Sequence, residues 1–524
     1  MKAHIVGGGF GGLAAAALLI RNANVSGPDI TIYEADGSLG GGYFLEGNPA
    51  SGYNLPGSVF DKEFRCGFEL LSWIPTLADP KVSVKDQFFN FNDANPYNDQ
   101  AHILDRNGAI VHDRHFGLGF SDALALLRVS VTPEPLLDGG RIEEYFSPDF
   151  FNTEFWLLWS TIMGSLPQHS VIEFRRYMNR FLYLFPHLST MAGVMRTPFN
   201  QNEAFVKPLV AWLTPQNVNF VTDAVVKDIG FEPAPGRITV NKLDYQRNGA
   251  TTSVAIAPED IVLVTTGSQA ADRSTGAMKT VPGAPLNPGQ SWALWSRLAQ
   301  GRNDFGRPDK YFGAPNVIAN SQWVTFTVTT TGPEFVDRVT KLLGGVEPGC
   351  GGLQTLRDSG WVISFSIFHQ PEILGQPNGT YVWWGYGLHP ERKGTFIEKP
   401  MDQCTGEEIL GEVLRNLRFD DQLDVITKSS ICIPCKLPYV NNIWLQRSRG
   451  DRPPVVPEGS TNLGLIGQYV ELEKDIAFTF EYSTRSAWEA IHQLLKRGPA
   501  PPPVYQGQTD PKGILAALEV FIGQ

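Results

Sequence analysis

The chain has 524 residues, of which 42% are hydrophobic and 19% charged, and this is the composition of a globular protein long enough for two or three domains. Its net charge of −11 argues against nucleic acid as a partner. Five cysteines, an odd number, fit a reducing cytoplasm better than a disulfide framework. No uninterrupted apolar run reaches the roughly 20 residues that a membrane helix needs, so we expect a cytoplasmic protein.

The first residues of the chain predict a dinucleotide site. An apolar stretch, 4–6, precedes glycines at positions 7, 9 and 12, and a helix of small residues is expected over 13–20. Gly7 allows a tight turn, Gly9 lets the backbone approach a diphosphate, and Gly12 lets the helix pack on its strand. The diphosphate would lie at the helix N-terminus, where free N–H groups favour negative charge. A glycine-rich turn that binds nothing is the alternative.

An acidic residue follows the second predicted strand, 30–33. The carboxylate of Glu34 is placed to accept hydrogen bonds from the adenosine ribose, and it would repel the 2′-phosphate of NADP. A further glycine-rich turn, 39–43, is typical of flavoproteins, in which its N–H groups reach the flavin side of the diphosphate. The cofactor that this order of elements favours is FAD.

The remaining sequence predicts an α/β fold, in which a Rossmann-like domain is assembled from discontinuous segments. The nucleotide-binding pattern recurs in three stretches, 1–60, 195–275 and 455–497. Residues 61–194 have aromatic and aliphatic residues at helical spacing and predict a mainly helical cap, while 276–454, rich in Trp, Thr and Val, predict a mixed β/α substrate domain. Residues 498–524 predict a proline-rich linker and a helix that docks on the body, with contact to a membrane surface as the alternative.

Several local patterns predict structure more strongly than chemistry. Residues 237–256 alternate as in a hairpin, and Thr405-Gly-Glu-Glu408 fits a helix capping box. Cys432 and Cys435 have the spacing of a redox pair, but their apolar neighbours indicate a buried strand, and no second cysteine pair completes a zinc site. His112 and His115 form a candidate acid–base pair in a polar segment that we expect at the surface.

Taken together, these segments resemble the oleate hydratase family of FAD-binding fatty-acid hydratases, once called myosin-cross-reactive antigens. The resemblance covers most of the chain, and its most specific parts are Arg65-Cys-Gly-Phe-Glu-Leu70, Phe151-Asn-Thr-Glu-Phe-Trp-Leu-Leu-Trp159, Thr197-Pro-Phe-Asn-Gln-Asn-Glu203, 399–408, 450–460 and 481–485. It implies the addition of water to a cis double bond of an unsaturated fatty acid. It also implies that Glu69 lies beside the flavin and helps to activate the water.

Motif and resemblance together give a set of expected cofactor contacts. They are Gly7, Gly9, Phe10, Gly11, Gly12, Glu34, Ala35, Gly41, Gly42, Arg65, Cys66, Gly67, Phe68, Val226, Thr266, Gly267, Ser268, Gly467, Gln468, Phe478 and Thr479. We expect no resident metal, and either a monomer or a homodimer.

The chain departs from the family where the proton donor is expected. Phe199, Gln201 and Asn202 are expected to contact the substrate, but the family's segment has tyrosines where this one has none. A phenylalanine cannot donate a proton and an amide has no practical acidity, so another acid must act. Tyr177 and Glu203 are the candidates.

The resemblance also places the anchor for the fatty-acid carboxylate within 430–449. The basic and amide residues available there are Lys436, Asn441, Asn442, Arg447 and Arg449. Because the family's tyrosines are missing, a redox flavoenzyme acting on an apolar substrate, such as a desaturase, isomerase or amine oxidase, is an alternative function. A lipid-binding or flavin-binding protein without catalysis is another.

Overall fold

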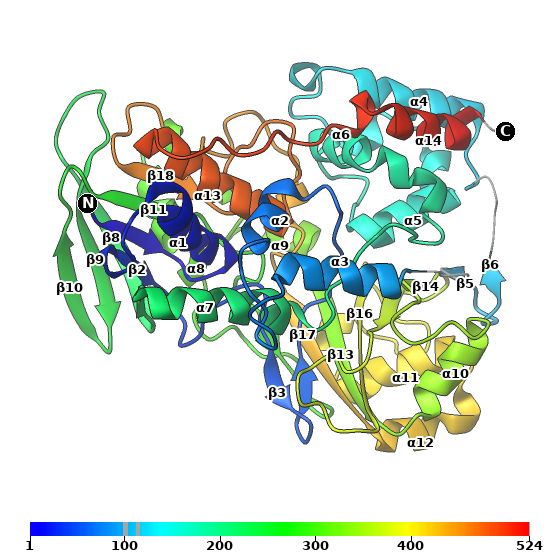
Figure 1. Ribbon diagram of the computed structural model, residues 1–524. Helices are drawn as coiled ribbons and strands as arrows, with labels where there is room; N and C mark the ends of the chain where they lie inside the picture. Colours follow the sequence, from blue (N-terminus) through cyan, green and yellow to red (C-terminus); the bar gives the residue numbers. More distant parts are fainter. Residues whose placement is uncertain (98–102, 112–115, 523–524) are drawn as a thin grey trace.

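The computed structural model describes residues 1–97, 103–111 and 116–522. Figure 1 shows a parallel sheet with its helices on the left, a second sheet at lower right and a group of helices at upper right. His112 and His115 lie outside the described residues, so their acid–base role stays a prediction.

The first sheet is assembled from separated stretches of sequence, as predicted. Its strand order is β18-β11-β1-β2-β7, and every neighbouring pair is parallel. The strands are β1 (Ala3–Val6), β2 (Ile30–Tyr33), β7 (Asn219–Val221), β11 (Ile261–Thr265) and β18 (Leu463–Ile466). The helices packed around this sheet include α1 (Phe10–Ala23), α7 (Lys207–Leu213) and α13 (Phe480–Leu495). Since helices cover a parallel sheet on both faces, β1, β2, β11 and β18 are mostly buried, whereas the edge strand β7 is exposed or half-buried.

An antiparallel sheet of three strands extends the nucleotide half at the left of Figure 1. It contains β8 (Ala224–Phe231), β9 (Val240–Arg247) and β10 (Ala250–Ala255). Arg247 pairs with Ala250 at the turn between β9 and β10, which confirms the hairpin predicted over 237–256.

The second sheet has eight strands in the order β12-β17-β13-β16-β15-β14-β5-β6. They are β5 (Ile103–Leu104), β6 (Ile110–Val111), β12 (Ser274–Thr275), β13 (Trp323–Thr331), β14 (Gln354–Leu356), β15 (Ile363–Ile367), β16 (Thr380–Gly387) and β17 (Ser430–Leu437). The last two strands of this order, β5 and the edge strand β6, come from the stretch predicted to be mainly helical. A hairpin, β3 (Glu46–Asn48) and β4 (Gly52–Asn54), packs on β13 and β17.

Alternation along β13 and β16 gives this sheet two different faces, because successive side chains of a strand point to opposite sides. Val324, Phe326 and Trp383 pack in the core under α10 (Glu334–Leu342), α11 (Gly406–Asn416) and α12 (Leu423–Lys428). Trp323 and Trp384 belong to a separate cluster on the other face. The second face is therefore free to form the wall of a cavity.

Two local predictions on this sheet hold. Thr405 Oγ1 accepts a hydrogen bond from the Glu408 N–H, and Glu408 Oε2 accepts one from the Thr405 N–H, so the capping box starts α11. Cys432 and Cys435 are buried in β17, and burial raises the pKa of the Cys435 thiol to about 12.

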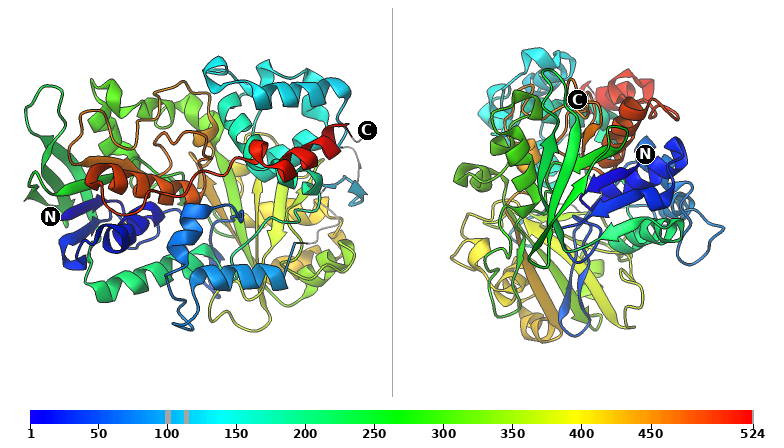
Figure 2. Two further views of the ribbon diagram at one scale, coloured as in Figure 1. Left: turned by 45° about the horizontal axis from the view of Figure 1, so that its top comes forward. Right: turned by 90° about the vertical axis from the view of Figure 1, so that its left-hand side faces the viewer.

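The remaining helices lie between and above the sheets. They are α2 (Arg65–Leu71), α3 (Val84–Ala94), α4 (Phe120–Val131), α5 (Glu154–Met163), α6 (Val171–Arg180), α8 (Gln290–Ala299), α9 (Pro315–Ser321) and α14 (Pro511–Ile522). The last of these contacts α4 and the 3₁₀ segment Leu182–His187 (Figures 1 and 2), so the terminal helix docks on the body as predicted. In the described part of the chain, no helix combines the length and the apolar character needed to cross a membrane.

Candidate functional site

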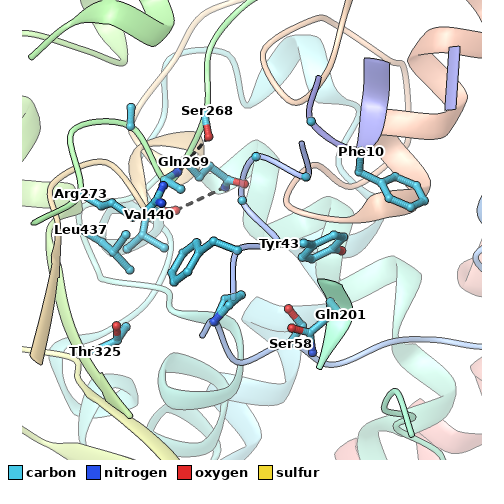
Figure 3. Close-up of a pocket in the computed structure, with 18 of the residues that line it drawn as sticks. Phe10, Tyr43, Ser58, Gln201, Ser268, Gln269, Arg273, Thr325, Leu437 and Val440 are labelled. Atoms are coloured by element: carbon cyan, nitrogen blue, oxygen red, sulfur yellow. Dashed lines mark hydrogen bonds between the residues drawn. The ribbon is translucent and has the colours of Figure 1, made fainter. Parts of the chain in front are cut away.

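A cavity of about 840 Å³ joins the glycine turn of the parallel sheet to the open face of the eight-stranded sheet. Figure 3 shows Phe10 and Tyr43 on the right of the cavity and Ser268, Leu437 and Val440 on the left. Fifteen of the predicted cofactor contacts line it: Gly7, Gly9, Phe10, Gly11, Glu34, Ala35, Gly41, Gly42, Val226, Gly267, Ser268, Gly467, Gln468, Phe478 and Thr479. The sequence therefore located one end of the cavity.

The glycine turn has the shape that a diphosphate requires. Gly7 has φ +102°, and a Cβ atom on it would lie 2.1 Å from Thr265 Oγ1. A Cβ atom on Gly12 would lie 1.9 Å from the Gly7 carbonyl oxygen, so α1 packs directly on the turn. The N-cap residue of α1 is Gly9, which has no side chain to cap the helix, and the first turn carries no acidic residue. The N–H groups of this turn are available for an anion.

Glu34 lies at the carboxyl end of β2, where its side chain is tied to backbone. Its Oε2 accepts a hydrogen bond of 2.6 Å from the Gly8 N–H, and its Oε1 accepts one of 2.9 Å from the Asp36 N–H. Burial raises the pKa of this carboxyl, and the two N–H donors act in the opposite direction. Each oxygen keeps capacity to accept a further hydrogen bond, as from a ribose hydroxyl.

The second glycine-rich turn lies against the first. The Gly40 N–H donates to the Gly8 carbonyl at 2.9 Å, and a Cβ atom on Gly41 would lie 3.0 Å from Gly9 Cα. No atom lies within 4 Å of the position that a Cβ would take on Gly42 or on Gly467. The close turn and the open space beside it form a cradle that fits the diphosphate of a dinucleotide.

The far part of the cavity is apolar and aromatic. The rings of Trp323 and Tyr386 stack with centroids 4.1 Å apart, and Trp384 lies beside Tyr386. The Tyr386 hydroxyl donates to the Thr161 carbonyl, so its polar end is already bound. Phe368, Leu437 and Val440 also line this part. Such a wall fits an acyl chain rather than a polar substrate.

A group of polar side chains interrupts the apolar wall: Arg196, Thr197, Gln201, His369 and Glu372. The Arg196 guanidinium lies 4.3 Å from the ring centroid of Tyr97, and its Nε and Nη1 atoms are buried without a hydrogen-bond partner. Gln201 Nε2 donates to Thr197 Oγ1 at 3.4 Å, and Gln201 Oε1 is buried without a partner. These orphaned groups lie where a polar part of a bound molecule would meet them.

The structure places Glu69 away from this cavity, contrary to the expectation that it lies beside the flavin. Residues 65–71 form the short helix α2, and Glu69 is on its exposed side. On the buried side, Phe68 packs against Phe480, whose ring lies 5.4 Å away, and Phe480 itself lines the cavity. Glu69 can act on a molecule in the cavity only if α2 is reoriented.

Other predicted cofactor contacts also lie outside the cavity wall. Arg65 pairs with Glu63 at 3.0 Å, and the Gly67 N–H donates to Glu481 Oε2 at 2.7 Å. Cys66 is buried beside Glu481, and burial raises the pKa of its thiol. The residues of the predicted set absent from the wall are Gly12, Arg65, Cys66, Gly67, Phe68 and Thr266. Four of these, Arg65, Cys66, Gly67 and Phe68, belong to α2.

Of the predicted substrate contacts, Gln201 lines the cavity, whereas Phe199 and Asn202 do not. Asn202 Nδ2 donates to the Tyr43 carbonyl at 2.7 Å and so supports the cavity wall from behind. The two candidate replacement acids also lie outside the wall. The Tyr177 hydroxyl donates to the Ala477 carbonyl, and Glu203 accepts from Lys207 Nζ at 2.8 Å.

The predicted carboxylate anchors do not line the cavity either. Arg447 is fully buried, with ion pairs to Glu173 at 2.7 Å and Glu471 at 3.0 Å, and Lys436 pairs with Asp402 at 3.2 Å. Asn441 Nδ2 donates to the Gly164 carbonyl and Asn442 Nδ2 to the Tyr311 carbonyl, whereas Arg449 is exposed and donates to Asp138 Oδ1 from its backbone N–H. The arginines that do line the cavity are Arg196 and Arg273.

Sequence reasoning missed His369 and Glu372. They lie in the loop between β15 and β16, which carries no recognisable motif, and only the folded sheet brings this loop to residues 196–201. Arg196 could have been predicted to lie at the cavity, because it directly precedes the segment 197–203 that resembles the family.

Comparison with known proteins places the chain in a family. It is 32% identical over 531 residues to an oleate hydratase of Streptococcus pyogenes serotype M49 (strain NZ131), covering 99% of this chain and 89% of that protein. It is 30% identical over 537 residues to a linoleate hydratase of Lactiplantibacillus plantarum, covering 94% and 93%. Cyclohexylamine oxidase from Brevibacterium oxydans IH-35A shares the fold alone, with a TM-score of 0.51, 12% identity and coverage of 94% and 98%. A profile of the MCRA family matches residues 1–492, and the chain therefore belongs to the MCRA family, as its motifs indicated.

Proposed function

We propose that this protein is an FAD-binding fatty-acid hydratase that adds water to a cis double bond of an unsaturated fatty acid. The observation that carries the proposal is the single cavity in which a dinucleotide cradle opens into an aromatic chamber with a buried polar corner. The full-length similarity to proteins named oleate hydratase and linoleate hydratase supports it.

The residues of the glycine turns fit FAD. The first turn of α1 would hold the diphosphate, Glu34 the ribose, and the backbone near Val226 the adenine. Gly467, Gln468 and Thr479 also line the cavity, and a Cβ atom on Gly11 would lie 3.9 Å from Gly467 Cα, so this segment would contact FAD beside the first turn. Hydration transfers no net electrons, so the bound flavin would supply a flat polar surface beside the substrate.

The chemistry of the side chains follows from the reaction. An isolated double bond is unreactive, so one carbon must be protonated by an acid while a base takes a proton from the adding water. The apolar chamber would hold the acyl chain and exclude bulk water, which strengthens the interactions of the few polar groups inside. The resemblance gives the water-activating role to Glu69, but the structure has Glu69 on the exposed side of α2. With α2 in this position, the base must be a group that lines the cavity.

The reaction can be tested with the full-length protein loaded with FAD. We expect a cis-unsaturated fatty acid from a panel of chain lengths to gain the mass of one water, without net change in the flavin spectrum. Anaerobic bleaching of the flavin by one of these lipids would instead favour the redox alternative. Retained FAD with no turnover across the panel would favour a binding protein.

We also propose peripheral contact with lipid through the helical region, because α4 and α14 carry exposed apolar side chains. Phe120 is 80% exposed, Val131 67% and Leu515 61%. These helices contact each other, and Figure 1 shows them at one end of the molecule. Co-sedimentation with phospholipid vesicles should be weakened by Phe120→Ser, while Val425→Ser on α12 should have no effect. Equal sedimentation of both variants would contradict the proposal.

A further inference from the structure

The polar corner of the cavity is built around one buried carboxyl group, that of Glu372. Its backbone is fixed on both sides: the Glu372 N–H donates to Gln376 Oε1 at 3.0 Å, and Asn200 donates to the Glu372 carbonyl from its N–H at 3.0 Å and from Nδ2 at 3.1 Å. Gln376 is in turn held by Gln370, whose Oε1 accepts from Gln376 Nε2 at 2.8 Å. The loop therefore holds Glu372 at the cavity wall against residues 196–203.

The carboxyl group itself has no partner. Glu372 is only 3% exposed, it lines the cavity, and none of the described residues hydrogen-bonds to either of its oxygens. Burial, followed by the negative charge of Glu203, holds the pKa of this carboxyl well above 4.5, while Arg196 acts in the opposite direction. A carboxyl group with a raised pKa that faces an apolar chamber is suited to act as a proton donor.

His369 provides the complementary group on the same loop. It lines the cavity, and its ring packs edge-on against Phe91 with centroids 4.9 Å apart. Burial, followed by the positive charge of Arg196, lowers the pKa of this imidazole below 6.5. The ring is therefore neutral near pH 7, where it can accept a proton.

We propose that Glu372 is the acid of the hydration reaction and His369 the base. This assignment rests on the proposed function. The Glu372 carboxyl gives its proton to one carbon of the double bond, water forms a C–O bond to the other carbon, and the proton that this water loses goes to the His369 imidazole. Transfer of that proton from His369 to the Glu372 carboxylate through water restores both groups, so atoms and charge balance without an oxidant.

Two other acids near residues 196–203 and the cavity are weaker candidates for geometric and chemical reasons. Glu203 accepts hydrogen bonds from Lys207, Asn200 and the Leu374 N–H, and it does not line the cavity. Tyr43 does line the cavity, but burial raises the pKa of its phenol above its ordinary value of 10.0. A neutral carboxylic acid is a far stronger donor than such a phenol.

The direct test is Glu372→Gln in the full-length protein with FAD, compared with Glu347→Gln at an exposed position. We expect Glu372→Gln to lower kcat roughly 100-fold or more while FAD affinity and Tm stay unchanged, since a positioned general acid contributes about 10²–10⁴-fold. The control should retain wild-type kcat. A Glu372→Gln variant with more than half of the wild-type kcat would overturn the assignment, as would loss of activity in Tyr43→Phe alone.

The dependence of kcat on pH distinguishes a catalytic role of Glu372 and His369 from a purely structural one, because a structural role would not shift the profile. Activity should fall as pH rises through the pKa of Glu372, and it should fall at low pH as His369 becomes protonated. Glu203→Gln removes the negative charge that raises the pKa of Glu372, so the alkaline limb should move to lower pH. His369→Gln should remove the acid limb, and an unchanged profile in both variants would overturn the proposal.

A measurement without turnover separates this inference from the proposed function. The infrared absorption of protonated carboxyl groups should be present at pH 7 in the protein without substrate and should lose one component in Glu372→Gln, since other buried carboxyls such as Glu34 absorb in the same region. If the wild type hydrates a fatty acid but this absorption is unchanged by the substitution, the assignment of Glu372 fails alone. If the wild type converts no fatty acid in the panel, the proposed function fails and this inference fails with it.

Discussion

The carboxylate of Glu34 accepts a hydrogen bond of 2.6 Å from the backbone N–H of Gly8. The acidic residue that follows β2 is thus tied directly to the turn that follows β1, and Glu34 lines the cavity together with Gly7 and Gly9 of that turn. Under the proposed function, the same carboxylate would serve both the fold and the bound FAD.

Replacement of this carboxylate should weaken cofactor binding. We expect Glu34→Ala to lower FAD affinity by about tenfold to a hundredfold, because hydrogen bonds to a charged group are worth about 1.5–3 kcal/mol. Titration followed by flavin fluorescence measures this, with the exposed Glu259→Ala as control. Equal FAD affinities of both variants would contradict the assignment of Glu34 to the ribose.

Two glycines of the turn should respond differently to alanine. A Cβ on Gly9 would meet only Gly41 Cα at 3.7 Å, so Gly9→Ala should keep the Tm of the cofactor-free protein but lose FAD binding. Gly7→Ala should lower Tm itself, because Gly7 has φ +102° and the new Cβ would lie 2.1 Å from Thr265 Oγ1. Calorimetry of both variants without FAD checks this, with Gly411→Ala in α11 as a control that adds no contact. A large loss of Tm in Gly9→Ala would contradict the assignment of Gly9 to FAD binding and of Gly7 to stability.

Arg447 should act on stability rather than on substrate binding. It is fully buried with Glu173 and Glu471, so Arg447→Leu leaves uncompensated buried charge and should destabilise the protein by about 3–5 kcal/mol. Denaturant unfolding measures this loss, and the exposed Arg449→Leu should have little effect. A raised KM with unchanged stability would instead restore the predicted carboxylate-anchoring role.

The same cluster makes stability depend on pH. The arginines around Glu471 lower the pKa of its carboxyl from 4.5 to about 2, although burial alone would raise it. A lowered pKa means that the folded state binds this proton less readily than the unfolded chain does. The stabilisation is therefore fully present above about pH 4.5 and is lost as pH falls toward 2.

The nucleotide half was predictable because its chemistry is local. The turn at Gly7, the cradle at Gly9 and the acidic Glu34 depend on residues within one βαβ unit, and each lies where its spacing placed it. The position of Glu69 was not predictable in this way. Its direction depends on the packing of Phe68 against Phe480, which is distant in sequence.

Long-range pairing also explains the other differences. Arg447 is a plausible carboxylate anchor until the fold brings Glu173 to within 2.7 Å of it from another part of the chain. Glu372 and His369 belong to no recognisable motif, and only the cavity that they line in the folded protein points to a chemical role for them. The spacing of residues along the chain predicts which side chains lie together within one helix, strand or turn. It does not predict which distant elements pack together, and those contacts decide which charged groups are buried or paired.

Glu69 offers a test of whether α2 changes position. In the structure the Gly67 N–H donates to Glu481, and Glu69 is exposed. We expect Glu69→Gln to lower kcat only if hydrogen exchange of the α2 amides increases when FAD and fatty acid bind. Exchange measured by mass spectrometry with and without both ligands checks this. Loss of kcat with unchanged exchange in α2 would contradict it.

The origin of the oxygen in the product tests the central claim most directly. When the FAD-loaded protein converts a cis-unsaturated fatty acid in H₂¹⁸O, hydration predicts one ¹⁸O atom per hydroxyl group formed, with the flavin spectrum unchanged at the end of turnover. A hydroxy product without ¹⁸O, or a product formed with stoichiometric reduction of the flavin, would contradict the account.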